Sequence, residues 1–126
     1  MVRYTTLALT GAALAAALVW SLPASAHHAA PASARVSAVN VTQGKPSEFH
    51  FTLSRRTVPK GTVTFLVINK GNIPHDFKIN GHKTRVLSPG QAQTLKVTFL
   101  RAGKYPYLCT VSGHAAAGMK GTFSVT

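Results

Sequence analysis

The chain has 126 residues, enough for one domain, and it carries fourteen Lys and Arg residues against two acidic residues, a formal net charge of +12 at pH 7. Such a surface favours acidic partners, whereas the scattered basic residues, without a basic arm or a known motif, argue against nucleic-acid binding. The single cysteine excludes an internal disulfide bond.

Residues 1–26 have the pattern of a secretory signal peptide. Arg3 supplies a positive charge, residues 7–20 form an apolar run, and an Ala-Ser-Ala sequence at 24–26 is a typical cleavage site. The apolar run is short for a membrane span, so membrane attachment is expected only if the segment stays uncleaved. We therefore expect export to the periplasm, the extracellular space or the outer face of the cytoplasmic membrane. Loss of Arg3 leaves thirteen basic residues against Glu48 and Asp76, a net charge of +11.

Residues 27–44 are interpreted as a flexible leader that ends in a possible first strand, because the segment begins with a stretch rich in Ala, Pro and Ser. Cleavage after residue 26 would expose His27 at a free amino terminus, which could chelate a metal ion together with its own imidazole. The simpler interpretation is a His-tipped leader. A second Ala-Ser-Ala sequence at 32–34 offers another cleavage point that would remove both His27 and His28.

From residue 45 onward, apolar and polar residues alternate with a period of two, which is typical of half-buried strands. The apolar members of these runs are Phe49, Phe51, Leu53, Val63, Phe65, Val67, Leu95, Val97, Phe99, Tyr105, Tyr107, Cys109, Phe123 and Val125. Turn signals separate the runs at short intervals, and no long amphipathic helix follows residue 25. The pattern predicts an all-β domain over 45–126, an antiparallel β-sandwich of about seven or eight strands.

Four side chains near the C-terminal end form a candidate metal site. Cys109, His114 and Met119 are spaced as C-x4-H-x4-M, and His75 lies upstream in an Asn-Ile-Pro-His-Asp-Phe segment. One thiolate and two imidazoles give a trigonal set suited to copper, and a distant thioether completes it as a weak axial ligand. The sequence therefore predicts one copper ion bound by these four residues.

The same residues allow two other interpretations. Cys109 could be a small buried hydrophobe beside an unrelated histidine and methionine. A structural zinc site usually draws on several cysteines and histidines and rarely uses a thioether. His75 favours the copper site over both, because it supplies the ligand that the loop lacks. His50 and His82 are expected to be surface histidines.

The stretch from residue 45 to residue 126 resembles the blue copper proteins, or cupredoxins. The matching segments lie at 57–65 (TVPKGTVTF), 69–77 (NKGNIPHDF), 87–91 (LSPGQ) and 103–109 (GKYPYLC), and the ligand loop is most similar to those of rusticyanin and sulfocyanin. The resemblance implies a Greek-key sandwich with one type 1 copper ion. It also implies that His75, Cys109 and His114 are the strong ligands, that Met119 is the axial one, and that all four gather at one end.

Three positions refine this resemblance. Thr110 follows Cys109 where multicopper oxidases carry a histidine, and the single cysteine excludes a binuclear electron-transfer centre. Asp76 follows the first histidine where relatives commonly carry Asn or Ser, and Ser112 replaces a proline that often precedes the Gly-His pair. Neither departure removes a ligand.

The resemblance implies a one-electron carrier that cycles between Cu(I) and Cu(II) and meets a redox partner protein, expected to have an acidic docking surface. The sequence shows no arrangement of catalytic acid, base or nucleophile and no small-molecule site, so we expect no enzymatic activity. The alternatives are a copper-binding protein for copper handling, resistance or delivery, and an accessory redox domain of a copper enzyme. Pro74 and residues 115–117 are expected to form a small apolar surface around His114.

Overall fold

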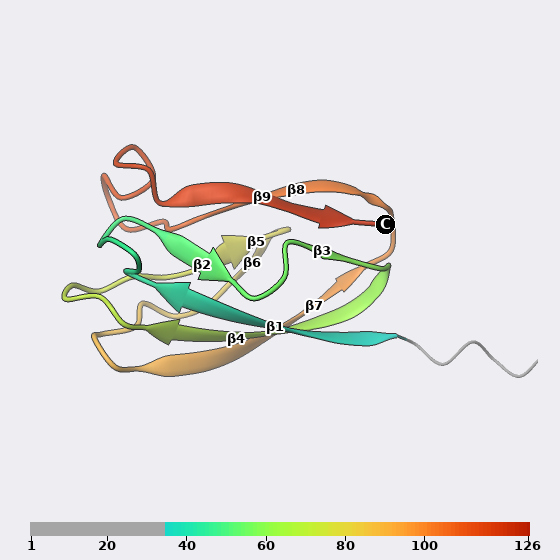
Figure 1. The fold of residues 1–126 in the computed structure, drawn as a ribbon, viewed down its shortest axis with the longest axis horizontal. Helices are drawn as coiled ribbons and strands as arrows, with labels where there is room; N and C mark the ends of the chain where they lie inside the picture. Colours follow the sequence, from blue (N-terminus) through green and yellow to red (C-terminus); the bar gives the residue numbers. More distant parts are fainter. Residues whose placement is uncertain (1–34) are drawn as a thin grey trace, which may run out of the picture. The chain divides into compact units, whose positions relative to one another are not determined.

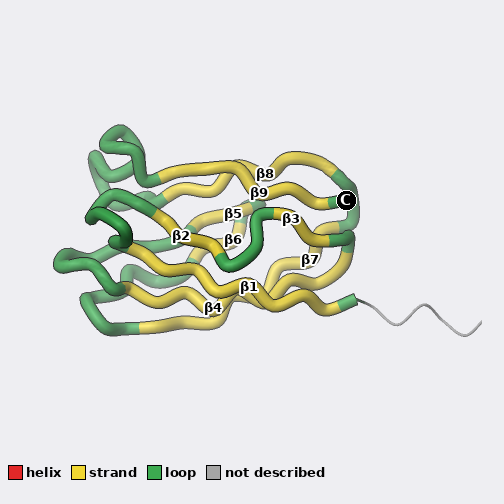
Figure 2. Tube along the Cα trace, viewed as in Figure 1, coloured by secondary structure: helices red, strands yellow, loops and turns green. Residues whose placement is uncertain are grey.

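The computed structural model describes residues 35–126, which form nine strands with no helix among them (Figures 1 and 2). The strands are β1 (Val36–Gln43), β2 (Phe51–Leu53), β3 (Thr57–Val58), β4 (Gly61–Asn69), β5 (Lys78–Ile79), β6 (His82–Lys83), β7 (Ala92–Phe99), β8 (Gly103–Leu108) and β9 (Lys120–Val125). The predicted all-β class is confirmed. The expected signal peptide and most of the leader fall on residues 1–34, outside the described part. Within that part no helix has the length and apolarity needed to cross a bilayer.

The strands form two sheets that face each other (Figure 1). One sheet has the order β2-β1-β4-β7 and the other β3-β9-β8-β5-β6. The first strand expected within 27–44 is β1, which lies between β2 and β4, so the sandwich begins before residue 45.

Most neighbouring strands are antiparallel, as predicted, but two pairs are parallel: β1 with β4, and β3 with β9. The cause is the path of the chain. After β1, strands β2 and β3 together carry the chain back along the sandwich and across to the second sheet. Strand β4 then starts at the end where β1 started, and it pairs with β1 in the same direction over residues 36–43 and 62–69.

The core lies between the sheets and follows the predicted alternation. In β4, Val63, Phe65 and Val67 are fully buried. The ring of Phe65 packs against those of Phe77 and Phe123, with centroid separations of 5.4 Å and 5.3 Å. Burial of each such side chain contributes about 1.5–3 kcal/mol to the free energy of folding. This tightly packed aromatic cluster supports the loops at the end of the sandwich.

The two loops that carry the predicted ligands, 70–77 and 109–119, gather with two further loops at one end of the sandwich, on the left in Figure 1. The two further loops are the segments 44–50 and 84–91. Backbone hydrogen bonds join them, from Lys70 N–H to the Gln43 carbonyl (3.0 Å) and from Asn69 N–H to the Gln91 carbonyl (2.9 Å). The sheet β2-β1-β4-β7 therefore extends its hydrogen bonding into this loop end.

Candidate metal centre

Three of the four predicted ligands converge at this end. One ligand atom from each of His75, Cys109 and His114 lies within 4.8 Å of the others. The two Nδ1 atoms of the histidines are 3.0 Å apart, and Sγ of Cys109 is 3.5 Å from Nδ1 of His114. His75 is 39 positions from His114 in the sequence, and Cys109 is 5 positions from it. All three nevertheless present their donor atoms to one small volume.

His75 is fixed by the backbone of a neighbouring segment. Its N–H donates to the carbonyl of Leu87 (3.0 Å), and Leu87 N–H donates to the carbonyl of His75 (2.7 Å). Asn69 supports both, because its side-chain amide donates to the Leu87 and Ile73 carbonyls while its oxygen accepts from Gly71 N–H, each at 2.8 Å. The imidazole is therefore carried by a loop with little freedom to move.

The other three ligands lie on the loop between β8 and β9, with Cys109 directly after β8 and Met119 directly before β9. Cys109 N–H donates to the Met119 carbonyl, and Met119 N–H donates to the His114 carbonyl, each at 3.0 Å. Gly113 and Gly118 take φ values of 81° and 114°, which other residues rarely adopt. These glycines supply the predicted turn, and the backbone closes Met119 against Cys109 and His114.

The candidate ligands differ in their exposure to solvent. His75 and Met119 are fully buried and Cys109 is 1% exposed, whereas His114 is 9% exposed. Burial raises the pKa of the Cys109 thiol and lowers the pKa of the His114 imidazole. The ring of Phe49 packs edge-on against His114 at a centroid separation of 5.1 Å. The centre is therefore shielded from water and approaches the surface at His114.

The residues expected to form an apolar surface around His114 reach solvent. Pro74, Ala116 and Ala117 are exposed, and Ala115 is partly exposed. The remaining described histidines stay outside the cluster, as predicted. His50 and His82 are both exposed, while His27 and His28 fall outside the described residues.

Asp76, one of the predicted departures from the family pattern, is fully buried beside the cluster. Its backbone N–H points to Sγ of Cys109 at 3.5 Å. Its carboxylate accepts hydrogen bonds from the backbone N–H and the hydroxyl of Thr110, and lies 3.8 Å from Nζ of Lys83. Asp76 thus links the segment of His75 to the segment of Cys109 and brings a negative charge to the centre.

Glu48 is a residue of the site that sequence reasoning missed. It lies between β1 and β2, and its Oε1 is 2.7 Å from Nε2 of His75. Hydrogen bonds from the backbone N–H of Asn72, and then from His75 and Ile73, hold the pKa of Glu48 below its usual value despite partial burial. Its being the only glutamate of a basic chain was the one available signal.

The donor set tests which metal this site can hold. A thiolate, two imidazoles and a thioether are soft and borderline ligands that suit copper and do not suit magnesium or calcium. His75 directs Nε2 toward Glu48, which leaves Nδ1 directed toward His114. The residues therefore fit one copper ion, and the chain carries the residue set of a type 1 copper centre in His75, Cys109, His114 and Met119.

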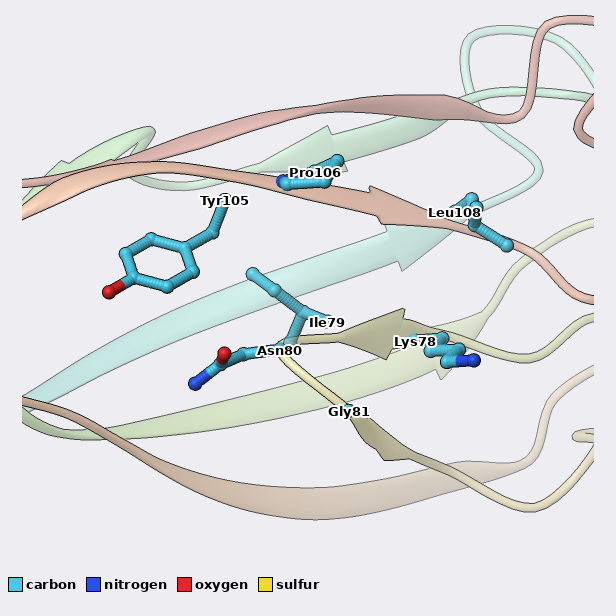
Figure 3. A pocket seen from close by; sticks show the side chains of 7 residues that line it. All are labelled: Lys78, Ile79, Asn80, Gly81, Tyr105, Pro106 and Leu108. Atoms are coloured by element: carbon cyan, nitrogen blue, oxygen red, sulfur yellow. The ribbon is translucent and has the colours of Figure 1, made fainter.

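A surface hollow of about 290 Å³ lies against β8 and the β5–β6 turn (Figure 3). Its lining residues are Lys78, Ile79, Asn80, Gly81, Tyr105, Pro106 and Leu108. None of them is a predicted ligand, although Leu108 directly precedes Cys109. The volume is near the lower limit for small-molecule pockets, and the lining brings no acid and base together.

Comparisons with known proteins support the fold. The family profile described as cupredoxin-like domain matches residues 12–124. Among solved structures, auracyanin B is 20% identical over 77% of this chain and 93% of its own, with a TM-score of 0.61. Auracyanin A, a "blue" copper protein from Chloroflexus aurantiacus, is 17% identical over 73% of this chain and all of its own (TM-score 0.59). Rusticyanin from Thiobacillus ferrooxidans is 23% identical over 75% and 79% (TM-score 0.58). No curated protein sequence matches significantly.

Proposed function

Because the chain belongs to the cupredoxin-like domain family, we propose that it binds one copper ion at a type 1 centre and carries single electrons between redox partners. The observation that carries this proposal is the convergence of His75, Cys109 and His114 within 4.8 Å at a buried end of the sandwich. His75, Cys109 and His114 are the strong ligands and Met119 is the weak axial ligand. Copper supplies the Cu(I)/Cu(II) couple when it is bound.

The framework suits electron transfer because it restrains the ligands in both oxidation states. Cys109 and Met119 adjoin strands of the same sheet, and His75 is tied by two backbone hydrogen bonds to Leu87. Ligands held in this way change position little when an electron arrives or leaves, and this lowers the reorganisation energy of each electron transfer. His114 is the most exposed of the four, so we assign it as the route to the partner.

The partner is proposed to be a redox protein with an acidic docking surface. Glu48 and Asp76 are the only acidic residues of the chain, and both contact the metal centre. Lys45, Lys70 and Lys120 are exposed in segments that adjoin it. A surface of one sign attracts and orients a partner of the opposite sign. The proposed place of this encounter is outside the cytoplasm, which rests on the signal-peptide pattern of residues 1–26.

The test is copper retention during turnover. The copper-loaded chain is reduced and reoxidised repeatedly in the presence of a Cu(I) chelator, and bound copper is measured after each cycle. An electron carrier keeps its copper and its full redox capacity. Loss of Cu(I) to the chelator within the first cycles would instead support copper delivery, the alternative that the ligand set leaves open.

A further inference from the structure

Glu48 is the one acidic residue whose carboxylate hydrogen-bonds the imidazole of a predicted ligand within residues 35–126. Its Oε1 lies 2.7 Å from Nε2 of His75. The same carboxylate accepts hydrogen bonds from the backbone N–H of Asn72 (3.0 Å and 2.9 Å) and of Ile73 (3.2 Å). Three donors from the His75 segment therefore hold one carboxylate that arrives from a different loop.

The packing of two glycines makes room for this contact. A Cβ atom on Gly44 would collide with the backbone of Gly71, so the loops that carry Glu48 and His75 approach as closely as backbone allows. A Cβ atom on Gly71 would collide with Oε1 of Glu48 and would lie 3.1 Å from Nε2 of His75. The carboxylate therefore occupies a fitted position rather than a solvent-exposed one, and its side chain is 23% exposed.

The contact has a consequence for the other ring nitrogen. A carboxylate accepts hydrogen bonds, so His75 must donate through Nε2–H, and its Nδ1 then presents a lone pair. That lone pair is directed toward Nδ1 of His114. Asp76, the other carboxylate nearby, bonds to Thr110 and Lys83 and has no such contact with either imidazole.

We propose that Glu48 is a positioning residue that fixes His75 as an Nδ1 ligand and shifts the centre toward Cu(II). This inference rests on the proposed copper function. Carboxylates behind a ligating imidazole fix its orientation and raise its basicity, and their loss typically weakens metal binding about 10–100-fold. A more basic ligand and a nearby negative charge stabilise the higher oxidation state more than the lower one.

The experiment compares the parent with Glu48→Gln, which keeps the size of the side chain but removes the charge. We expect the affinity for Cu(II) to fall at least tenfold more than that for Cu(I), which raises the reduction potential by at least about 59 mV for a one-electron couple. The coupling of copper to the remote nitrogen of His75, measured by pulsed EPR, is expected to change as well.

Two control variants separate this role from others. Asp76→Asn removes a carboxylate that lies close to the centre but bonds to Thr110 and Lys83 rather than to the His75 imidazole, so it is expected to leave the remote-nitrogen coupling unchanged. Ser47→Ala alters the same loop. The Ser47 hydroxyl bonds to His50 (2.6 Å) and not to a predicted ligand, so this variant is expected to keep the parent potential. Gly71→Ala is a second test that retains the charge but displaces it, and it should reproduce the change in nitrogen coupling.

A lower melting temperature of Glu48→Gln with the parent potential and nitrogen coupling would overturn the proposal, because Glu48 would then only join two loops. The metal-free chain gives an independent reading through ¹⁵N NMR of its histidines. We expect His75 to carry its proton on Nε2 in the parent and to become a mixture of tautomers in Glu48→Gln. A parent His75 protonated on Nδ1 would overturn the proposal even if copper binding failed altogether, so the two failures are distinguishable.

Discussion

The Nδ1 atoms of His75 and His114 lie 3.0 Å apart, although the two residues are 39 positions apart in the sequence and lie on different loops. His75 directs its other nitrogen to Glu48, so two ring nitrogens and the Cys109 sulfur face the same small volume. Buried lone pairs in such an arrangement are stabilised by a shared cation. These three donors are the proposed strong ligands. Loss of one of them should therefore affect copper binding more than loss of the axial ligand Met119.

His75→Ala should weaken copper binding or open a coordination position to water, because a strong bond is lost. Met119→Leu should keep both copper and colour, since the thioether is a weak and distant donor. It should raise the reduction potential, because an apolar side chain replaces a donor that helps to stabilise Cu(II). Met119→Gln, which offers a harder oxygen, should lower the potential. Copper content and redox titration measure these effects.

One outcome would contradict the assignment of Met119 as the axial ligand. If Met119→Leu loses copper as completely as His75→Ala, Met119 is not a weak axial ligand and the type 1 geometry is wrong.

Asp76→Asn should raise the reduction potential, because removing a buried negative charge near the centre costs Cu(II) more than Cu(I). Lys83 provides the opposite control. Its Nζ lies 3.8 Å from the Asp76 carboxylate and its side chain is half exposed, so Lys83→Gln should produce a smaller shift in the downward direction. A potential that falls in Asp76→Asn would show that the carboxylate acts through the Thr110 hydrogen bonds rather than through its charge.

The sequence predicted the strongest features of the site because they depend on local patterns. The spacing of Cys109, His114 and Met119 fixes their loop, and alternating residues such as Val63 and Phe65 identify the strands. Contacts between distant segments could not be predicted in this way. Glu48 reaches His75 because their two loops pack closely at Gly44 and Gly71. A contact between residues 27 positions apart cannot be read from the local pattern around either of them.

The parallel pairing of β1 with β4 escaped prediction for a related reason. Alternation along β1 shows which residues face the core, but it carries no information on the direction of the neighbouring strand. That direction depends on how β2 and β3 return the chain along the sandwich.

Gln43 offers a test of the interior at the same end of the sandwich. Its side chain is fully buried, and within residues 35–126 neither polar atom of its amide has a hydrogen-bond partner. Gln43→Met keeps the volume and removes the unsatisfied groups, so it should raise the free energy of unfolding by about 1–2 kcal/mol. Thermal unfolding would show this as a rise of about 4–8 °C for each kcal/mol.

Gln93→Met is the matched control for this prediction. The side chain of Gln93 accepts a hydrogen bond from Arg85 N–H at 2.9 Å and is partly exposed, so its replacement should give no gain. A loss of stability in Gln43→Met would show that the Gln43 amide has a partner.

Electron transfer to an acidic partner should slow as salt rises, because exposed charges are screened beyond about 10 Å at 0.1 M ionic strength. The measurement is the rate of reduction of the copper-loaded chain by an acidic flavoprotein at increasing ionic strength. An uncharged small-molecule reductant is the control and should give a nearly constant rate. Flavoprotein rates that ignore ionic strength would remove the argument for an acidic docking surface.

The central claim is that Cys109, with His75 and His114, binds copper as a type 1 centre, and the optical and EPR spectra of the Cu(II)-loaded chain test it most directly. The account predicts an intense blue or green absorption from charge transfer between the Cys109 thiolate and Cu(II), and its disappearance on reduction. Cys109→Ser should lose that colour and remain a folded sandwich by circular dichroism. A parent chain without the absorption, or a Cys109→Ser variant with an unchanged spectrum, would contradict the copper assignment.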